Sequence, residues 1–176
     1  MSRGSLPVMR RLMLFRHGKS DWDAGYDTDH GRPLAKRGRK AATTMGTVLR
    51  NMREVPDRLV SSTAVRAEAT AELARIGGGW SCSLELAPDL YGAGPDEVLH
   101  IAARLGGDAS KVMLVGHEPT WSMLAARITG GRIMVKTGTV LAFDLDIDTW
   151  DDAPGASGTL AFAVHPRMFN DGNWKL

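Results

Sequence analysis

Short apolar runs alternate with amphipathic helical patterns along this chain. The apolar runs occupy residues 11–15, 58–60, 83–86 and 111–115, and the helical patterns occupy residues 36–52, 64–76, 95–105 and 119–129. This alternation is typical of strands and crossover helices around a mostly parallel sheet, so it predicts an α/β fold. Two further runs, residues 140–145 and 159–164, are expected to form strands at the edge of the sheet.

The spacing of the apolar side chains predicts which face of each helix is buried. In the helix over residues 36–52 the expected inward residues are Ala41, Met45, Val48, Leu49 and Met52. In the next helix they are Val65, Ala69, Leu73 and Ile76, and in the last helix Trp121, Leu124, Ala125 and Ile128. The hydroxyl residues 61–63 offer caps to the helix over residues 64–76, and the glycines at 77–79 are expected to end it.

Length and charge narrow the class of protein. The chain of 176 residues is long enough for a sizeable core, and we expect residues 1–176 to form a single domain. The 22 basic and 20 acidic residues leave a net charge of +2, which argues against a nucleic-acid partner. No apolar stretch approaches the ~18 residues of a membrane span, and residues 1–11 lack the apolar centre of a secretory signal. The single cysteine, Cys82, fits a reducing compartment, so we expect a soluble, cytoplasmic protein whose residues 1–10 form a flexible N-terminus.

Two of the apolar runs end in histidine. Arg16 and His17 come directly after the first run, and only Gly116 separates the fourth run from His117. Because the carboxyl ends of parallel strands meet at one edge of a sheet, these side chains are expected to lie close together. Arg66 falls in the first turn of the second helix, where backbone N–H groups point toward the same edge. Two arginines, two histidines and a helix N-terminus predict an anion pocket suited to a phosphoryl group.

A long polar segment follows the first strand. Residues 19–33 are polar and rich in glycine, and no helical pattern begins within them. Loops of this length in a compact domain are usually functional, so we expect side chains from this segment at the rim of the pocket. The candidates for the rim are Asp21, Trp22, Asp23, Tyr26, His30 and Arg32, and the candidates for contact with phosphate are Lys19 and Ser20. For Trp22 the alternative is burial beneath the loop, and Lys19 and Ser20 alternatively only begin the loop.

The residue types in this pocket predict nucleophilic catalysis. A neutral imidazole attacks phosphorus through one ring nitrogen while a backbone or carboxylate partner holds the other nitrogen as a donor. We therefore expect His17 to take the phosphoryl group first and water to release phosphate afterwards. The arginines offset the charge on the phosphoryl oxygens, so the reaction is expected to need no metal and no other cofactor.

Four motifs follow one another along residues 11–143. They are Leu14-Phe15-Arg16-His17-Gly18-Lys19-Ser20, then Arg32-Pro33-Leu34 with Arg37-Gly38, then Pro56-Asp57 through Ser61-Ser62 to Ala64-Val65-Arg66 and Thr70-Ala71-Glu72, and finally Val115-Gly116-His117-Glu118-Pro119. In this order and spacing they resemble the histidine phosphatase superfamily, and within it the small bacterial phosphohistidine phosphatases. The resemblance implies a three-layer, phosphoglycerate mutase-like α/β domain, with His17 as the phosphorylated nucleophile and Arg16, Arg66 and His117 around the phosphoryl group. It also implies an uncovered site, which admits a phosphorylated side chain of another protein.

Glu118 departs from the pattern of the small phosphohistidine phosphatases, in which asparagine usually follows the second histidine. In the acid phosphatase branch an acidic residue just after this histidine protonates the leaving group, so one hypothesis makes Glu118 the general acid for small phosphomonoesters. The alternative places Glu118 at the N-cap or in the first turn of the helix that begins near Pro119, where a carboxylate is favourable anyway.

The leaving group decides between two kinds of substrate. Phosphohistidine expels an imidazole, which accepts a proton near pH ~6.5 and therefore depends less on an acid than an alkoxide does. The sequence offers no clear general acid besides Glu118. This pattern favours phosphohistidine on a protein as the substrate, with small phosphomonoesters as the alternative.

Other functional classes are weighed against this hypothesis. A cysteine phosphatase places an arginine six residues after its cysteine, but Pro88 holds that position relative to Cys82. A metallohydrolase with His17 and His117 as ligands is disfavoured because the nearby arginines repel a cation. A domain that only binds phosphorylated partners keeps the arginines but needs no nucleophile. The basic residues of the loop and first helix either guide an acidic partner or form a solvated face; they are Arg32, Lys36, Arg37, Arg39 and Lys40.

Overall fold

Six strands form one sheet within residues 9–169, the part of the chain that the computed structural model describes. The strands are β1 (Arg10–Arg16), β2 (Arg58–Ser61), β3 (Leu84–Leu86), β4 (Lys111–Gly116), β5 (Val140–Leu145) and β6 (Gly158–Val164). Their order is β3-β2-β4-β1-β5-β6; β1 to β4 run parallel, and β5 runs antiparallel to both of its neighbours. The mostly parallel sheet confirms the predicted α/β class.

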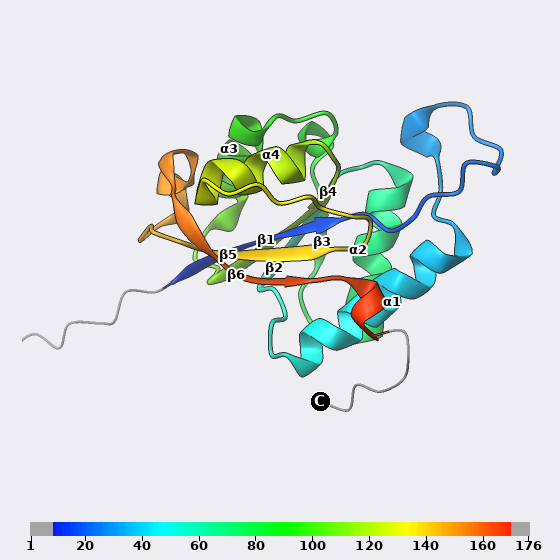
Figure 1. The fold of residues 1–176 in the computed structure, drawn as a ribbon, viewed down its shortest axis with the longest axis horizontal. Helices are drawn as coiled ribbons and strands as arrows, with labels where there is room; N and C mark the ends of the chain where they lie inside the picture. Colours follow the sequence, from blue (N-terminus) through cyan, green and yellow to red (C-terminus); the bar gives the residue numbers. More distant parts are fainter. Residues whose placement is uncertain (1–8, 170–176) are drawn as a thin grey trace, which may run out of the picture.

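Helices cover both faces of the sheet and complete the three layers. α1 (Lys36–Asn51) and α2 (Val65–Gly78) lie on one face, and α3 (Pro95–Gly106) and α4 (Thr120–Thr129) lie on the other (Figure 1). No helix of residues 9–169 is long and apolar enough to cross a membrane. Of the N-terminus expected to be flexible, residues 1–8 lie outside the described residues, whereas Arg10 begins β1 and pairs with Leu145, so the expectation was wrong for Arg10.

The hydrophobic core is divided by the sheet into two parts. Side chains alternate between the faces along a strand. In β1, Leu12 and Leu14 therefore join the core beneath α3 and α4, while Met13 and Phe15 join the core beneath α1 and α2. All four are fully buried, so β1 is held rigidly up to the residues that follow it.

One strand lies deeper in the sheet than expected. Both C-terminal strands were expected at an edge, but only β6 is an edge strand, and β5 pairs with β1 on one side and β6 on the other. The antiparallel direction explains the difference, because the hairpin of β5 and β6 covers the side of β1 that the parallel strands leave open.

The buried face predicted for α2 was wrong. Val65 is 40% exposed and Ile76 is 63% exposed, whereas Ala67 and Ala74 are fully buried. Small residues fill this face because α1 and α2 cross closely, and a Cβ atom on Gly46 of α1 would lie only 1.9 Å from the carbonyl oxygen of Ala74. The close approach of the two backbones therefore determines which face of α2 is buried. The positions of its larger apolar side chains do not.

Most of the buried residues predicted for α1 and α4 are confirmed. The four inward residues predicted for α4 are all buried, as are Met45, Val48 and Leu49 of α1. The remaining two predicted for α1, Ala41 and Met52, are only half-buried. Of the three glycines expected to end α2, Gly77 and Gly78 lie inside the helix, and Gly79 is its C-cap, in a left-handed conformation.

Candidate active site

The carboxyl ends of β1 and β4 bring two histidines together. Arg16 pairs with Gly116 in the parallel register, so His17 and His117 leave the sheet at neighbouring points. The backbone N–H of His17 donates to the carbonyl oxygen of Gly116 at 3.0 Å, and the centroids of the two imidazole rings lie 5.3 Å apart. The long loop after β1 extends beyond this edge of the sheet (Figure 1). The convergence expected from the sheet topology is therefore present.

His17 is held as a neutral imidazole whose lone pair lies on Nε2. Its side chain is buried, and Nδ1 lies 2.7 Å from the carbonyl oxygen of Gly18. A carbonyl oxygen can only accept, so the proton resides on Nδ1 and the lone pair on Nε2. The guanidinium Nε of Arg66 donates toward Nε2 at 3.3 Å. Burial, followed by the charges of His117 and of the nearby arginines, lowers the pKa of His17 to about 3.

The first turn of α2 fixes Arg66 beside His17. The Arg66 side chain is buried, and its backbone carbonyl accepts from the hydroxyl of Thr70 at 2.6 Å. The same hydroxyl accepts from the backbone N–H of Gly18 at 3.0 Å. The loop after β1 and the start of α2 are thus joined through one side chain, which sets the position of the guanidinium relative to the imidazole.

Arg16 and His117 each carry a buried nitrogen without a hydrogen-bond partner in residues 9–169. Arg16 donates from Nη1 to the carbonyl oxygen of Val135 at 2.7 Å, but its Nε has no partner. His117 Nε2 lies 2.9 Å from the hydroxyl of Ser62, and its Nδ1 has no partner. Burial lowers the pKa of His117 to about 4. Buried polar atoms are nearly always paired, so two unpaired ones on residues that line the same cavity indicate a place for a ligand with hydrogen-bonding atoms.

The predicted catalytic residues, the two candidates for phosphate contact and Glu118 all border one cavity of about 320 Å³. Of the six rim candidates only Trp22 and Arg32 line it; the other four do not, namely Asp21, Asp23, Tyr26 and His30. Lys19 and Ser20 lie in its wall, although the hydroxyl of Ser20 is already taken by the guanidinium of Arg32. Trp22 is 62% exposed and stacks over the guanidinium of Arg32 at 3.6 Å, so it lies on the rim and the alternative of burial was wrong. The lining residues are Arg16, His17, Lys19, Ser20, Trp22, Asp29, Arg32, Arg66, His117, Glu118 and Thr137.

Known proteins share both the sequence pattern and the fold. Residues 12–91 match the model of the histidine phosphatase superfamily (branch 1). An uncharacterized chloroplastic protein of Arabidopsis thaliana is 28% identical over 181 residues, covering 98% of this chain and 78% of that protein. A protein of Nakamurella multipartitia, described as a proposed phosphohistidine phosphatase SixA, is 30% identical over 90% of this chain and 96% of that one, and superposes with a TM-score of 0.71. The chain belongs to the histidine phosphatase superfamily.

A more distant structure agrees in fold. The protein histidine phosphatase SixA complexed with tungstate is 23% identical and superposes with a TM-score of 0.77, covering 91% of this chain and 99% of that one. The three-layer, phosphoglycerate mutase-like architecture implied by the sequence motifs is therefore confirmed.

Sequence reasoning missed Asp29 in this histidine phosphatase. The Asp29 carboxylate accepts from Arg66 Nη2 at 2.8 Å, from Arg32 Nη2 at 2.7 Å and from the hydroxyl of Tyr91 at 3.1 Å. The hydrogen bond from Arg32 does most to lower the pKa of Asp29 to about 2. Asp29 therefore stays ionised and holds the long loop against α2. The spacing of Asp29 and Arg32 in the sequence, three residues apart, was the available signal.

Glu118 points to the cavity from a position before α4. The N-cap of α4 is Pro119, so Glu118 lies one residue before the positions that the capping alternative gave it. The backbone N–H of Ser122, in the first turn of α4, nevertheless stabilises the charged Glu118 carboxylate, so a capping contribution stays an alternative to the acid role. The carboxylate accepts from the hydroxyl of Ser122 at 2.9 Å. Burial raises the pKa of Glu118 above its ordinary value, while that hydrogen bond and the charge of Arg16 act in the opposite direction. A raised pKa extends upward the pH range over which the Glu118 carboxyl is protonated.

Proposed function

We propose that this histidine phosphatase removes phosphate from phosphohistidine on a protein, through a phosphoryl group carried transiently by His17. One observation carries the proposal: the neutral His17 imidazole has its Nε2 lone pair beside the cations Arg66 and Arg16, while Gly18 holds its other nitrogen. The similarity to a protein described as a proposed phosphohistidine phosphatase SixA supports the same assignment.

In the first step the Nε2 lone pair of His17 attacks phosphorus. The new N–P bond forms as the P–N bond to the substrate histidine breaks, and that electron pair returns to the substrate nitrogen, which takes up a proton. Arg16 and Arg66 donate to the phosphoryl oxygens as their charge shifts, and His117 supplies a further donor through the nitrogen that lacks a protein partner.

In the second step water attacks the phosphoryl group on His17. The oxygen of water bonds to phosphorus, the P–Nε2 bond breaks, and the water proton passes to solvent as inorganic phosphate leaves. The electron pair returns to Nε2, which restores the starting imidazole. Because the pKa of His17 is lowered to about 3, the ring stays unprotonated and ready for the next cycle at neutral pH.

We propose that neither step uses a metal ion. Two arginines already supply positive charge to the phosphoryl oxygens, and they oppose binding of a cation at the same point. Among residues 9–169, no three His, Cys, Asp or Glu side chains are grouped as a metal site requires.

A substrate panel tests the proposed function. A phosphohistidine peptide should be hydrolysed with a kcat/KM at least about tenfold above those of sugar and nucleotide monophosphates, because its imidazole leaves without strong acid assistance. Addition of EDTA should leave the rates unchanged. Hydrolysis of the monophosphates alone would refute phosphohistidine as the substrate, and loss of all activity in EDTA would refute the metal-free mechanism.

Small phosphomonoesters are the second candidate substrate, and the position of Glu118 favours them. If Glu118 is the acid, Glu118→Gln should lower turnover of an alkyl phosphate by about 100-fold and leave phosphohistidine turnover within about threefold. The wild-type rate on the alkyl phosphate should fall as pH rises through the raised pKa of Glu118, because the protonated form is then lost. The variant should lack this pH dependence.

The matched control for this prediction is Glu85→Gln, which alters an exposed carboxylate on β3 outside the cavity. It should leave both substrates and the pH profile unchanged. Equal rates of wild type and Glu118→Gln on the alkyl phosphate would remove Glu118 from the mechanism.

A further inference from the structure

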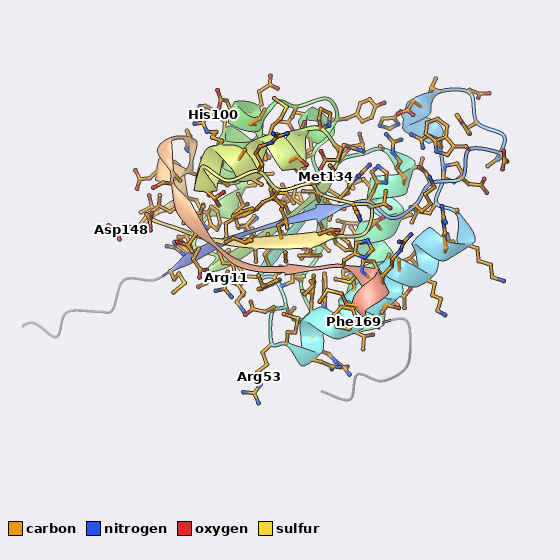
Figure 2. All side chains as sticks on the ribbon, in the orientation of Figure 1. Arg11, Arg53, His100, Met134, Asp148 and Phe169 are labelled. Carbon is orange, nitrogen blue, oxygen red and sulfur yellow. The ribbon has the colours of Figure 1, made fainter. Side chains whose placement is uncertain are left out.

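A second cavity adjoins the phosphoryl pocket. Its volume is about 630 Å³, and it shares Arg16, Lys19 and Thr137 with the pocket. It lies between the loop after β1, α1, the segment before β5, and the short helix Pro166–Phe169, which Figure 2 shows ending at Phe169 beside α1. We call this cavity the basic groove after its six cationic residues, Arg16, Lys19, Arg37, Lys40, Lys136 and Arg167.

The cations of the basic groove form no ion pair within residues 9–169, although the charge of Arg16 also acts on Glu118 in the adjoining pocket. None of the residues that line the groove is acidic. None of its six cations is within ion-pair distance of a carboxylate of the described residues, although nine other such pairs are formed. The lowered pKa of His165 agrees with this charge, since Arg167 and Lys136 add to the effect of burial. The groove therefore has a positive potential that an anionic ligand would offset.

The exposure of these cations indicates which kind of anion fits. Arg37, Lys40, Lys136 and Arg167 are exposed and come from three separate segments that line the groove: α1, the segment before β5, and the helix Pro166–Phe169. In the phosphoryl pocket, by contrast, Arg66 is buried and points its donors at one place. A compact second phosphate is best held by convergent, buried donors. Several solvated cations in a row instead match several carboxylates along an extended chain.

We propose that the basic groove binds an acidic segment of the phosphorylated protein while its phosphohistidine occupies the adjoining pocket. This inference rests on the proposed function and specifies its substrate: acidic residues lie close to the phosphohistidine. The two cavities meet at Arg16 and Lys19, so one continuous chain can reach both.

The basic run noted in the sequence is divided by α1 into two sets. Arg37 and Lys40 are three residues apart on one helix face and line the groove. Lys36 and Arg39 are equally exposed on the same helix but do not line it. The first pair is therefore assigned to partner binding and the second pair to a solvated face. This division provides a control with the same helix and the same change in charge.

The test compares two phosphohistidine peptides, one flanked by glutamates and one by glutamines, on three proteins. At low salt the wild type should show a kcat/KM about tenfold higher for the glutamate peptide. In R37E/K40E this ratio should fall to about one, mainly through KM, while K36E/R39E should keep it. Raising the salt to 1 M should also bring the wild-type ratio toward one.

A binding measurement separates the groove from the proposed function. Fluorescence anisotropy with the unphosphorylated glutamate peptide should show binding to the wild type and K36E/R39E, and at least tenfold weaker binding to R37E/K40E. If neither phosphopeptide is hydrolysed but this binding pattern holds, the proposed function fails and the groove assignment stands. Equal loss in both double variants, or in neither, would overturn the groove assignment. The assignment would also be overturned if R37E/K40E weakened the binding of a nucleoside 3′,5′-bisphosphate but changed neither the binding of the glutamate peptide nor that of the nucleoside 5′-monophosphate, because the groove would then hold a second phosphate.

Discussion

His17→Ala is expected to reduce turnover of a phosphohistidine peptide by roughly 10⁴-fold or more, to the level of the uncatalysed background. The substitution removes the Nε2 lone pair that faces Arg66, and no other described imidazole takes its position. His117 cannot substitute, because its Nε2 is engaged by Ser62 and its ring is offset by 5.3 Å. The measurement is kcat from phosphate release under saturating peptide.

The fold of the His17→Ala variant is expected to survive. His17 lies at the end of the sheet and belongs to neither part of the hydrophobic core. The variant loses one hydrogen bond to Gly18 and one from Arg66, each with a net worth of about 1 kcal/mol. It also loses a desolvated imidazole surrounded by cations, which partly offsets this cost. The melting temperature should therefore fall by only a few degrees.

A chemical label distinguishes a nucleophile from a residue that merely binds. Brief exposure of the wild type to a ³²P-phosphohistidine substrate, followed by alkaline quench, should leave an acid-labile label on the peptide that contains His17. His100→Ala is the matched control, because His100 is exposed on α3 and lies away from the loop after β1 (Figure 2). It should retain both label and turnover. Wild-type turnover in His17→Ala, or a label on another residue, would reject His17 as the nucleophile.

The positions of the site residues were predictable because they depend on topology. Parallel strands end at one edge, so residues that follow β1 and β4 had to approach each other once the α/β pattern was recognised. The register of Arg16 against Gly116 then determines the neighbourhood of the two histidines. Arg66 was also predictable, because the helix after β2 starts at the same edge.

Features that depend on side-chain contacts were not predictable from periodicity. The small residues of α2 face α1 because Gly46 allows the backbones of the two helices to approach closely. The spacing of apolar side chains in the sequence does not indicate how close two helices will be. Asp29 begins a 3₁₀ helix of three residues (Asp29–Gly31) within the long loop, and an element this short has no repeated spacing that would show which way a side chain points. The basic groove joins residues from distant parts of the sequence, so the basic run near α1 did not reveal which of its members would gather there.

Arg66→Ala is expected to lower kcat by about 10²- to 10³-fold, the second largest effect among the substitutions considered. Arg66 is a cation in direct hydrogen-bond contact with Nε2 of His17, the nitrogen that we propose attacks phosphorus. In the proposed mechanism, loss of Arg66 removes a hydrogen-bond donor to the phosphoryl oxygens in the transition state, when the negative charge on those oxygens is redistributed. The charge of Arg66 also contributes to the lowered pKa of His17, so the pKa of His17 should rise in the variant. NMR titration of the imidazole measures that rise separately from turnover.

Arg66→Lys separates charge from geometry. Lysine keeps the positive charge but cannot reproduce the fork that contacts His17 Nε2 together with the carbonyl and carboxylate oxygens of Asp29. We expect it to recover part of the activity, leaving a defect of about tenfold, and to keep the pKa of His17 low. Arg104→Ala, which breaks an exposed ion pair with Asp89, is the control and should change neither kcat nor the titration. Full activity in Arg66→Ala would mean that Arg16 and His117 alone stabilise the transferred phosphoryl group, and the role given to the start of α2 would have to be abandoned.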